Sequence, residues 1–212
     1  GTLAIGRGTA TGALGGSADG YDGPPKSATA TTVPAGLTVD FTYDGETNRP
    51  IDMGSYAVTG TVNDANWQGS ATGTLTIGKA PATVALTNLL HVYDGTAKQA
   101  AATTDPAGLT VDLTYEGSTT APSNAGSYAV TGTVNDANYQ GIATGTMAIA
   151  KASATVALGD LAQVYDGAAK SATATTDPAG LAVVFTYDGS ATAPTAAGSY
   201  AVTGTVNEAN WQ

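Results

Sequence analysis

Apolar and polar residues alternate with a period of two over short stretches of the chain. Between residues 110 and 115, the apolar side chains Val111, Leu113 and Tyr115 are separated by polar ones. Because successive side chains of a β-strand point to opposite faces, this stretch predicts a strand with one buried face. The same reasoning predicts further short strands over residues 99–104, 128–134, 144–149 and 154–158.

Turn-forming sequences separate these stretches. They are Asp-Gly, Glu-Gly, Asn-Asp and Pro-Ala-Gly segments, in which glycine, proline and Asx residues favour chain reversal. About six or seven short strands separated by turns are typical of an immunoglobulin-like β-sandwich. The pattern therefore predicts an all-β fold.

The alternating pattern repeats along the chain. Tyr-Asp-Gly begins at Tyr21, Tyr93 and Tyr165, so the offset is 72 residues, the difference between 93 and 21. The run Gly-Ser-Tyr-Ala-Val-Thr-Gly-Thr-Val-Asn occurs with the same offset from Gly54, Gly126 and Gly198. A period of this length is longer than the 20–50 residues of most solenoid repeats and fits a small sandwich that buries its own core. We call each such sandwich a bead.

The register of the motifs divides the chain into beads. Bead 1 spans residues 6–78, bead 2 spans 79–150, and bead 3 spans 151–212 and lacks a last strand. Residues 1–5 match the last strands that begin at Gly73 and Gly145, so they are an orphan last strand. Two explanations fit: the chain is a window from a longer array, or this strand completes bead 3 of a neighbouring chain. Almost no linker separates the beads, which predicts an elongated, stiff rod.

Two features of the aromatic residues stand out. Tyr128 follows a turn and precedes a core position by two residues, which predicts a tyrosine corner whose hydroxyl bonds back to the loop. A tyrosine packed in the core is the alternative. Trp67 follows the turn at Asn63, which makes its class, with Tyr139 and Trp211, the most exposed of the aromatic positions. The aromatics as a whole are interpreted as core filling.

Charge and composition narrow the function classes. The net charge is −10, with seven Lys and Arg residues against seventeen Asp and Glu. An acidic chain lacks the basic face that nucleic acids and anionic membranes require. No apolar stretch is long enough to span a bilayer, and the absence of cysteine removes disulfide and thiol chemistry. His91 has no histidine counterpart in the other beads, so no catalytic role is expected and the chain is not predicted to be an enzyme.

Two kinds of structural site are considered. The Asn-Asp turns offer oxygen ligands for calcium, although ordinary Asx turns explain the same residues. The calcium candidates are Asp64, Asp136 and Glu208. The repeated lysines could form isopeptide cross-links, with solubility of an edge strand as the alternative explanation. The cross-link candidates are Lys26, Lys98 and Lys170 with Asn66, Asn138 and Asn210. No other cofactor is expected.

Several motifs together resemble the bacterial MBG ("mostly beta, glycine-rich") repeat family, within the wider bacterial immunoglobulin-like group. They are Tyr-Asp-Gly at Tyr93, Tyr-Glu-Gly at Tyr115, the run from Ala125 to Tyr139, and Ala-Thr-Gly-Thr from Ala143 leading to Lys151. The resemblance implies tandem arrays in large secreted proteins of the bacterial cell surface, often adhesin-like, and supplies no catalytic residues.

We therefore expect a structural module of an extracellular filament, stalk or adhesin. Its expected partners are copies of itself or further repeats, end to end. The alternative is an adhesive module that binds a surface glycan or protein through exposed aromatics and turn loops.

Overall fold

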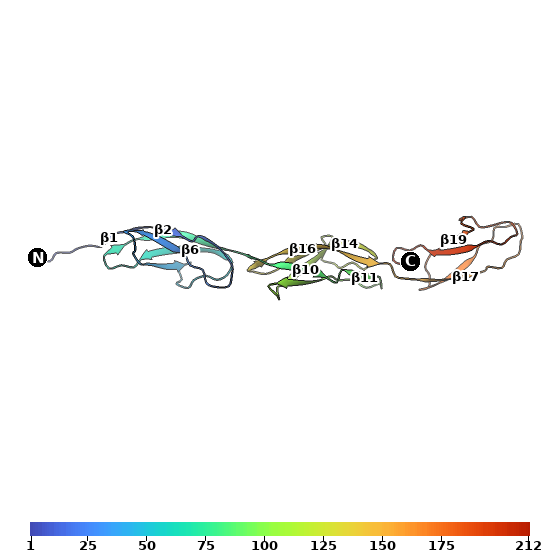
Figure 1. The fold of residues 1–212 in the computed structure, drawn as a ribbon, viewed down its shortest axis with the longest axis horizontal. Helices are drawn as coiled ribbons and strands as arrows, with labels where there is room; N and C mark the ends of the chain where they lie inside the picture. The colour runs from blue at the N-terminus through green and yellow to red at the C-terminus, as the bar shows by residue number, and fades with distance from the viewer. The chain divides into compact units, whose positions relative to one another are not determined.

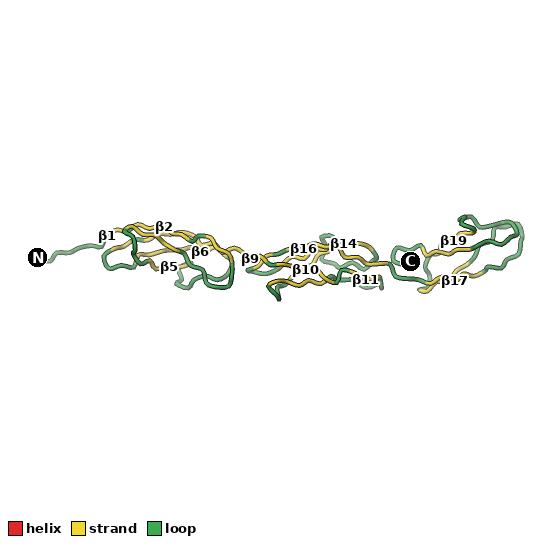
Figure 2. Tube along the Cα trace, in the orientation of Figure 1, coloured by secondary structure: helices red, strands yellow, loops and turns green.

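The computed structural model describes all 212 residues and contains strands, turns and loops without any helix (Figure 2). None of its elements is therefore an apolar helix of membrane-spanning length. The chain divides into two compact units. Residues 1–84, 104–112 and 133–142 form the first unit, and residues 85–103, 113–132 and 143–212 form the second. Bead 1, bead 2 and bead 3 are residues 6–78, 79–150 and 151–212.

Bead 1 consists of two sheets and a short parallel pair (Figure 1). Its strands are β1 (Gly8–Thr9), β2 (Thr11–Gly15), β3 (Ala18–Gly20), β4 (Thr29–Val33), β5 (Val39–Tyr43), β6 (Gly54–Val62), β7 (Trp67–Gln68) and β8 (Ser70–Gly78). Strand β2 pairs with β4, and the larger sheet has the order β3-β8-β6-β5. The neighbours β5-β6 and β6-β8 are antiparallel, whereas β3 runs parallel to β8.

Bead 2 repeats this arrangement strand for strand. Its strands are β9 (Ala80–Pro81), β10 (Thr83–Thr87), β11 (Leu90–Val92), β12 (Ala101–Asp105), β13 (Val111–Tyr115), β14 (Gly126–Val134), β15 (Tyr139–Gln140) and β16 (Ile142–Ala150). The four-stranded sheet has the order β11-β16-β14-β13, and β11 is again parallel to its neighbour β16.

Bead 3 forms only two two-stranded sheets. Its strands are β17 (Thr155–Gly159), β18 (Thr173–Asp177), β19 (Val183–Tyr187) and β20 (Val202–Val206). Strand β20 has five residues where β6 and β14 have nine. No strand forms over residues 162–164, the position of β11, and in bead 2 the strand to which β11 pairs is the last strand β16.

The two sheets of bead 1 pack face to face through small and large residues. Leu14 of β2 packs against a buried cluster drawn mainly from the other sheet. A Cβ atom on Gly60 or Gly73 would lie 3.1 Å from the Leu14 methyl carbons, so these glycines leave the space that Leu14 fills. The cluster comprises Ala28, Tyr43, Val58, Leu75 and Ile77. The predicted all-β tandem repeat is thus confirmed.

The Tyr-Asp-Gly motif at Tyr43 forms the hairpin turn that the sequence predicts. Asp44 and Gly45 have φ values of 50° and 88°, the positive pair that a two-residue type I′ turn requires. The Tyr43 N–H donates to the Glu46 carbonyl over 2.7 Å, and the reverse bond is 2.9 Å. The same positive φ pairs recur at Glu116-Gly117 and Asp188-Gly189.

Two tyrosine classes have different hydrogen bonds. The Tyr56, Tyr128 and Tyr200 hydroxyls donate to backbone carbonyls four residues upstream, which confirms the predicted tyrosine corner. The Tyr43 class is the buried one, and its hydroxyl accepts a backbone N–H instead. In bead 2 this bond runs from the Ala100 N–H to the Tyr115 hydroxyl over 3.0 Å.

Replacing Tyr115 with phenylalanine is expected to lower the free energy of unfolding of bead 2 by about 1–3 kcal/mol, because the buried Ala100 N–H loses its acceptor. Urea unfolding of the full chain, followed through the NMR signals of bead 2, measures the change. Tyr93→Phe is the matched control, since the Tyr93 ring packs against Trp211 and its hydroxyl makes no hydrogen bond. Equal losses in the two variants would contradict the assignment.

Candidate functional site

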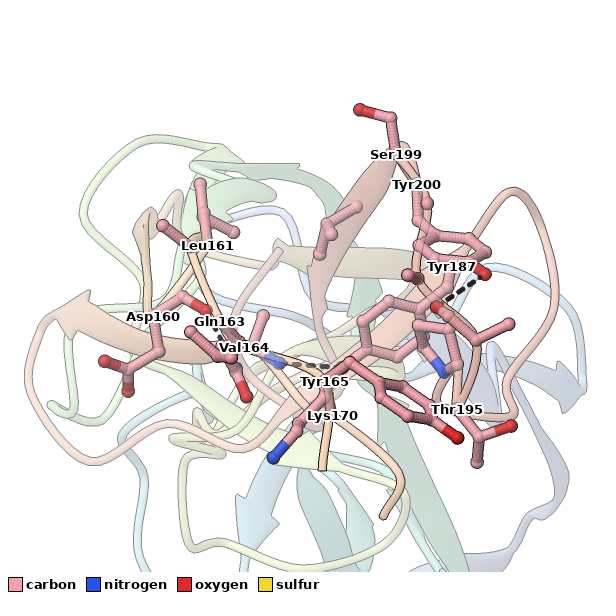
Figure 3. Close-up of a pocket in the computed structure, with 17 residues that line it drawn as sticks. Asp160, Leu161, Gln163, Val164, Tyr165, Lys170, Tyr187, Thr195, Ser199 and Tyr200 are labelled. Atoms are coloured by element: carbon pink, nitrogen blue, oxygen red, sulfur yellow. Dashed lines mark hydrogen bonds between the residues drawn. The ribbon is translucent and has the colours of Figure 1, made fainter. Parts of the chain in front are cut away.

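Bead 3 carries an open groove of about 450 Å³. Figure 3 shows the segment from Asp160 to Val164 on one side of it and Tyr187 and Tyr200 on the other. The Tyr187 hydroxyl accepts the Ala172 N–H over 2.9 Å, so the same hydrogen bond as in the other beads fixes Tyr187 at this side of the groove. Tyr165 is 65% exposed at the groove.

The groove corresponds to the place of the last strand in beads 1 and 2. Leu75 and Ile77 of β8 are each 1% exposed in the core of bead 1. Met147 and Ile149 of β16 take the same positions in bead 2, at 0% and 3%. The groove is lined by the bead 3 counterparts of the residues that surround those side chains, which include Tyr165, Ala172, Tyr187 and Tyr200. In beads 1 and 2 a strand with two apolar residues at this spacing occupies the equivalent position.

The Asn-Asp turns chosen as calcium candidates are closed by their own hydrogen bonds. Asp64 Oδ1 accepts the N–H groups of Asn66 and Trp67 over 2.7 and 3.0 Å. Asp136 Oδ1 does the same for Asn138 and Tyr139. Glu208 Oε1 accepts the Ala182 N–H instead. The structure gathers no three His, Cys, Asp or Glu side chains at one point that could hold a metal ion.

Basic residues at the start of each bead bind the same turns. The Arg7 guanidinium donates to the carbonyls of Asp64 and Trp67. Lys79 Nζ donates to the Asp136 carbonyl over 2.7 Å, and Lys151 Nζ to the Glu208 carbonyl over 2.6 Å. Each turn is thereby fixed to the chain segment that enters its bead.

The lysines proposed for isopeptide bonds lie beside aspartates. Lys26 Nζ is 2.7 Å from Asp22 Oδ2 and 3.2 Å from Asp19 Oδ2. Lys98 and Lys170 each pair with one aspartate, Asp94 and Asp166, which are the counterparts of Asp22. The structure does not bring Lys26 to Asn66 or Lys170 to Asn210, because these ammonium groups are engaged by the nearby Tyr-Asp-Gly motif.

Two of the three candidate asparagines, Asn138 and Asn210, lie where two beads meet. Within the first unit, the Asn138 side chain of bead 2 contacts Asp52 and Met53 of bead 1. Within the second unit, the Asn210 side chain of bead 3 contacts Asn124 and Ala125 of bead 2. These contacts span 85 or 86 residues along the sequence.

The aromatic residues that follow these asparagines are half-buried, so the expected high exposure of the Trp67 class is wrong. The Tyr139 ring packs edge-to-face on Tyr21, with ring centroids 5.3 Å apart. Trp211 packs in the same way on Tyr93, at 5.6 Å. The sequence reasoning missed Tyr21, Tyr93, Asp52 and Asn124 as contact residues. These residues hold equivalent repeat positions, and almost no linker separates the beads. Together these two features of the sequence could have indicated contacts between beads.

The fold and these contacts define a tandem-repeat all-β protein whose successive beads contact each other. The model of the MBG domain family matches residues 10–81, 82–153 and 154–212. The chain therefore belongs to the MBG domain family. No curated protein matches the chain.

The Lys98–Asp94 ion pair predicts a measurable pKa change. The hydrogen bond from Lys98, followed by those from the Thr96 hydroxyl and N–H, holds the pKa of Asp94 well below its ordinary 3.8. The carboxylate therefore stabilises the fold at pH values above 3.8, and this contribution is lost as the pH falls through the lowered pKa. Lys98→Met is expected to raise the pKa of Asp94 toward 3.8.

An NMR titration of the Asp94 carboxyl carbon checks this expectation. Asp166 of bead 3 serves as the control in the same molecule, since its pKa is lowered mainly by its own partner Lys170. An Asp94 titration that is unchanged by Lys98→Met would contradict the assigned cause.

Proposed function

We propose that the chain is a structural repeat module of an extracellular filament, stalk or adhesin on a bacterial cell surface, and not an enzyme. Membership of the MBG domain family and the tandem order of the beads support a repeat module of a surface protein. The observation that carries the mechanical part of the proposal is the pairing of an early strand with the last strand in beads 1 and 2.

In beads 1 and 2 an early strand and the last strand are parallel neighbours. Ala18–Gly20 pairs with residues 76–78, and Leu90–Val92 pairs with residues 148–150. Tension along the polypeptide pulls an early strand toward the N-terminus and the last strand toward the C-terminus. Since the two strands are parallel and adjacent, this pull acts along them and loads their hydrogen bonds together rather than one after another. Such a bead suits a stalk or filament under tension.

A second parallel pair strengthens the entry to each bead. Strand β1 pairs with β7, and β9 pairs with β15, each over two residues. The backbone bonds that flank the β9 pair, from Ala80 N–H to Asn138 and from Ala82 N–H to Gln140, are both 2.8 Å. The segment that joins one bead to the next is therefore itself hydrogen-bonded into the bead that it enters.

Single-molecule pulling of the full chain tests this mechanical role. Beads 1 and 2 are expected to unfold in two separate events, each releasing chain at up to about 3.3–3.6 Å per residue. His91→Pro removes an N–H from the β11–β16 pair and should lower the force of one event, while bead 1 provides the unchanged event in the same molecule. Two events that remain at the wild-type force would count against shear loading.

The groove of bead 3 supports a finer proposal, that residues 1–5 of one chain complete bead 3 of a second copy. Leu3 and Ile5 are 87% and 88% exposed, whereas their counterparts Leu75 and Ile77 are each 1% exposed. Burying each such side chain contributes roughly 1.5–3 kcal/mol, and strand pairing satisfies exposed backbone groups of the groove. Repetition of this contact joins chains head to tail.

Sedimentation velocity over a range of protein concentrations tests strand donation. The wild-type chain is expected to assemble as its concentration rises, and Leu3→Ser with Ile5→Ser should prevent assembly. Leu90→Ser is the matched control, because Leu90 is 82% exposed but lies outside residues 1–5. Assembly of the double variant at wild-type concentrations would exclude residues 1–5 as the donor.

The adhesive alternative depends on exposed aromatics and turn loops. Tyr139 and Trp211 use their rings to contact Tyr21 and Tyr93, which leaves less aromatic surface for a glycan. The observations thus favour the structural role over glycan or protein binding through this class of residues.

A further inference from the structure

The loop that precedes β15 presents an asparagine side chain to bead 1. Asn138 Oδ1 accepts the Met53 N–H over 2.7 Å, and Asn138 Nδ2 donates to Asp52 Oδ1 over 2.9 Å. All these residues belong to the first compact unit. One carboxamide therefore satisfies a donor and an acceptor of the neighbouring bead at once, which a carboxylate, having only acceptors at neutral pH, does not do.

The same arrangement recurs between beads 2 and 3, within the second unit. Asn210 Oδ1 accepts the Ala125 N–H over 2.8 Å, and Asn210 Nδ2 donates to Asn124 Oδ1 over 3.2 Å. Met53 and Ala125 differ in side chain, but only their backbone N–H groups are used. Asp52 and Asn124 differ in charge, yet each presents an oxygen to the Nδ2 group.

The neighbouring aromatic residue adds an apolar contact to each hydrogen-bonded pair. Tyr139 meets Tyr21 at an interplanar angle of 80°, and Trp211 meets Tyr93 at 82°. Edge-to-face pairs of this kind are favourable and directional. At the first of these contacts, Asp136 accepts the N–H groups of both Asn138 and Tyr139. These bonds fix the backbone of both contact residues within bead 2 itself.

From these contacts we propose that the asparagine–aromatic dipeptide of each bead is a docking element for the preceding bead. Its socket is the backbone N–H at position 53 or 125, the side-chain oxygen at 52 or 124, and the ring of Tyr21 or Tyr93. The partner is thus another bead of the same kind, recognised by polar groups of fixed geometry and one aromatic face. The docking couples neighbouring beads, and it holds whether or not the chain serves as a surface stalk.

Hydrogen exchange of the full chain, resolved to single amides by NMR, tests the docking. Asn138→Ala is expected to speed exchange of the Met53 amide by roughly 2- to 10-fold, as loss of one exposed hydrogen bond implies, and to leave the Ala125 amide unchanged. Asn210→Ala should do the reverse. Asn66→Ala is the matched control, since Asn66 holds the same repeat position but its side chain makes no contact with another bead.

A charge substitution separates docking from a general loss of structure. Asn138→Asp places a carboxylate against the Asp52 carboxylate and should speed exchange at Met53. Asn210→Asp faces the Asn124 amide, which can turn its Nδ2 group toward the new carboxylate, so the Ala125 amide should stay protected. The buried Val130 amide reports the integrity of bead 2 in every variant.

The proposal is overturned if Met53 keeps its wild-type exchange rate in Asn138→Ala, or if Asn66→Ala accelerates Met53 to the same extent. It is also overturned if the Met53 and Val130 amides both exchange faster, because the effect would then be unfolding of bead 2. Equal responses to Asn138→Asp and Asn210→Asp would contradict the assigned Nδ2 contacts.

Discussion

The packing of the last strand is the interaction on which each bead depends. In bead 1, β8 pairs with β6 on one side and with β3 on the other, and it contributes both Leu75 and Ile77 to the core. One strand therefore supplies backbone partners to two neighbours and apolar side chains to the cluster beneath them. Burial and pairing are coupled. Strand β8 can complete its hydrogen-bond ladders with β6 and β3 only in the register that also points its apolar residues into the core.

Bead 3, residues 151–212, contains no counterpart of β8 or β16. Its sheets remain two-stranded, and the residues at the position of β11 form no strand. Tyr187 stays buried, because its hydroxyl still accepts the Ala172 N–H, but Tyr165 becomes exposed. The pairs β17–β18 and β19–β20 thus form between strands that long loops join, whereas the four-stranded sheets of beads 1 and 2 contain the last strand.

The contacts between beads use a different balance of forces from the cores. Cores rely on apolar burial, and the only polar side-chain groups among the buried residues are the hydroxyls of Tyr43, Tyr115 and Tyr187. The contacts between beads rely on side-chain amides, backbone N–H groups and paired rings, most of them half-buried or exposed. Such contacts contribute little energy individually, but their directions are restrictive. A repeat protein can in this way keep each bead independently packed and still couple it to its neighbour.

Much of the fold was predictable from residues that act locally. The period of two around Val111, Leu113 and Tyr115 specifies a strand and its buried face, and Asp44-Gly45 specifies a hairpin turn through positive φ values. The docking residues were not predictable in this way. Asn138 was interpreted as a cross-link candidate and the Trp67 class as exposed, because their partners lie in another bead, 85 or 86 residues away for the asparagines. By itself the sequence determined the repeat, the strands and the turns, since these depend on near neighbours along the chain. Only the tertiary structure decided which polar groups meet between beads, because that depends on where two separately folded loops come together.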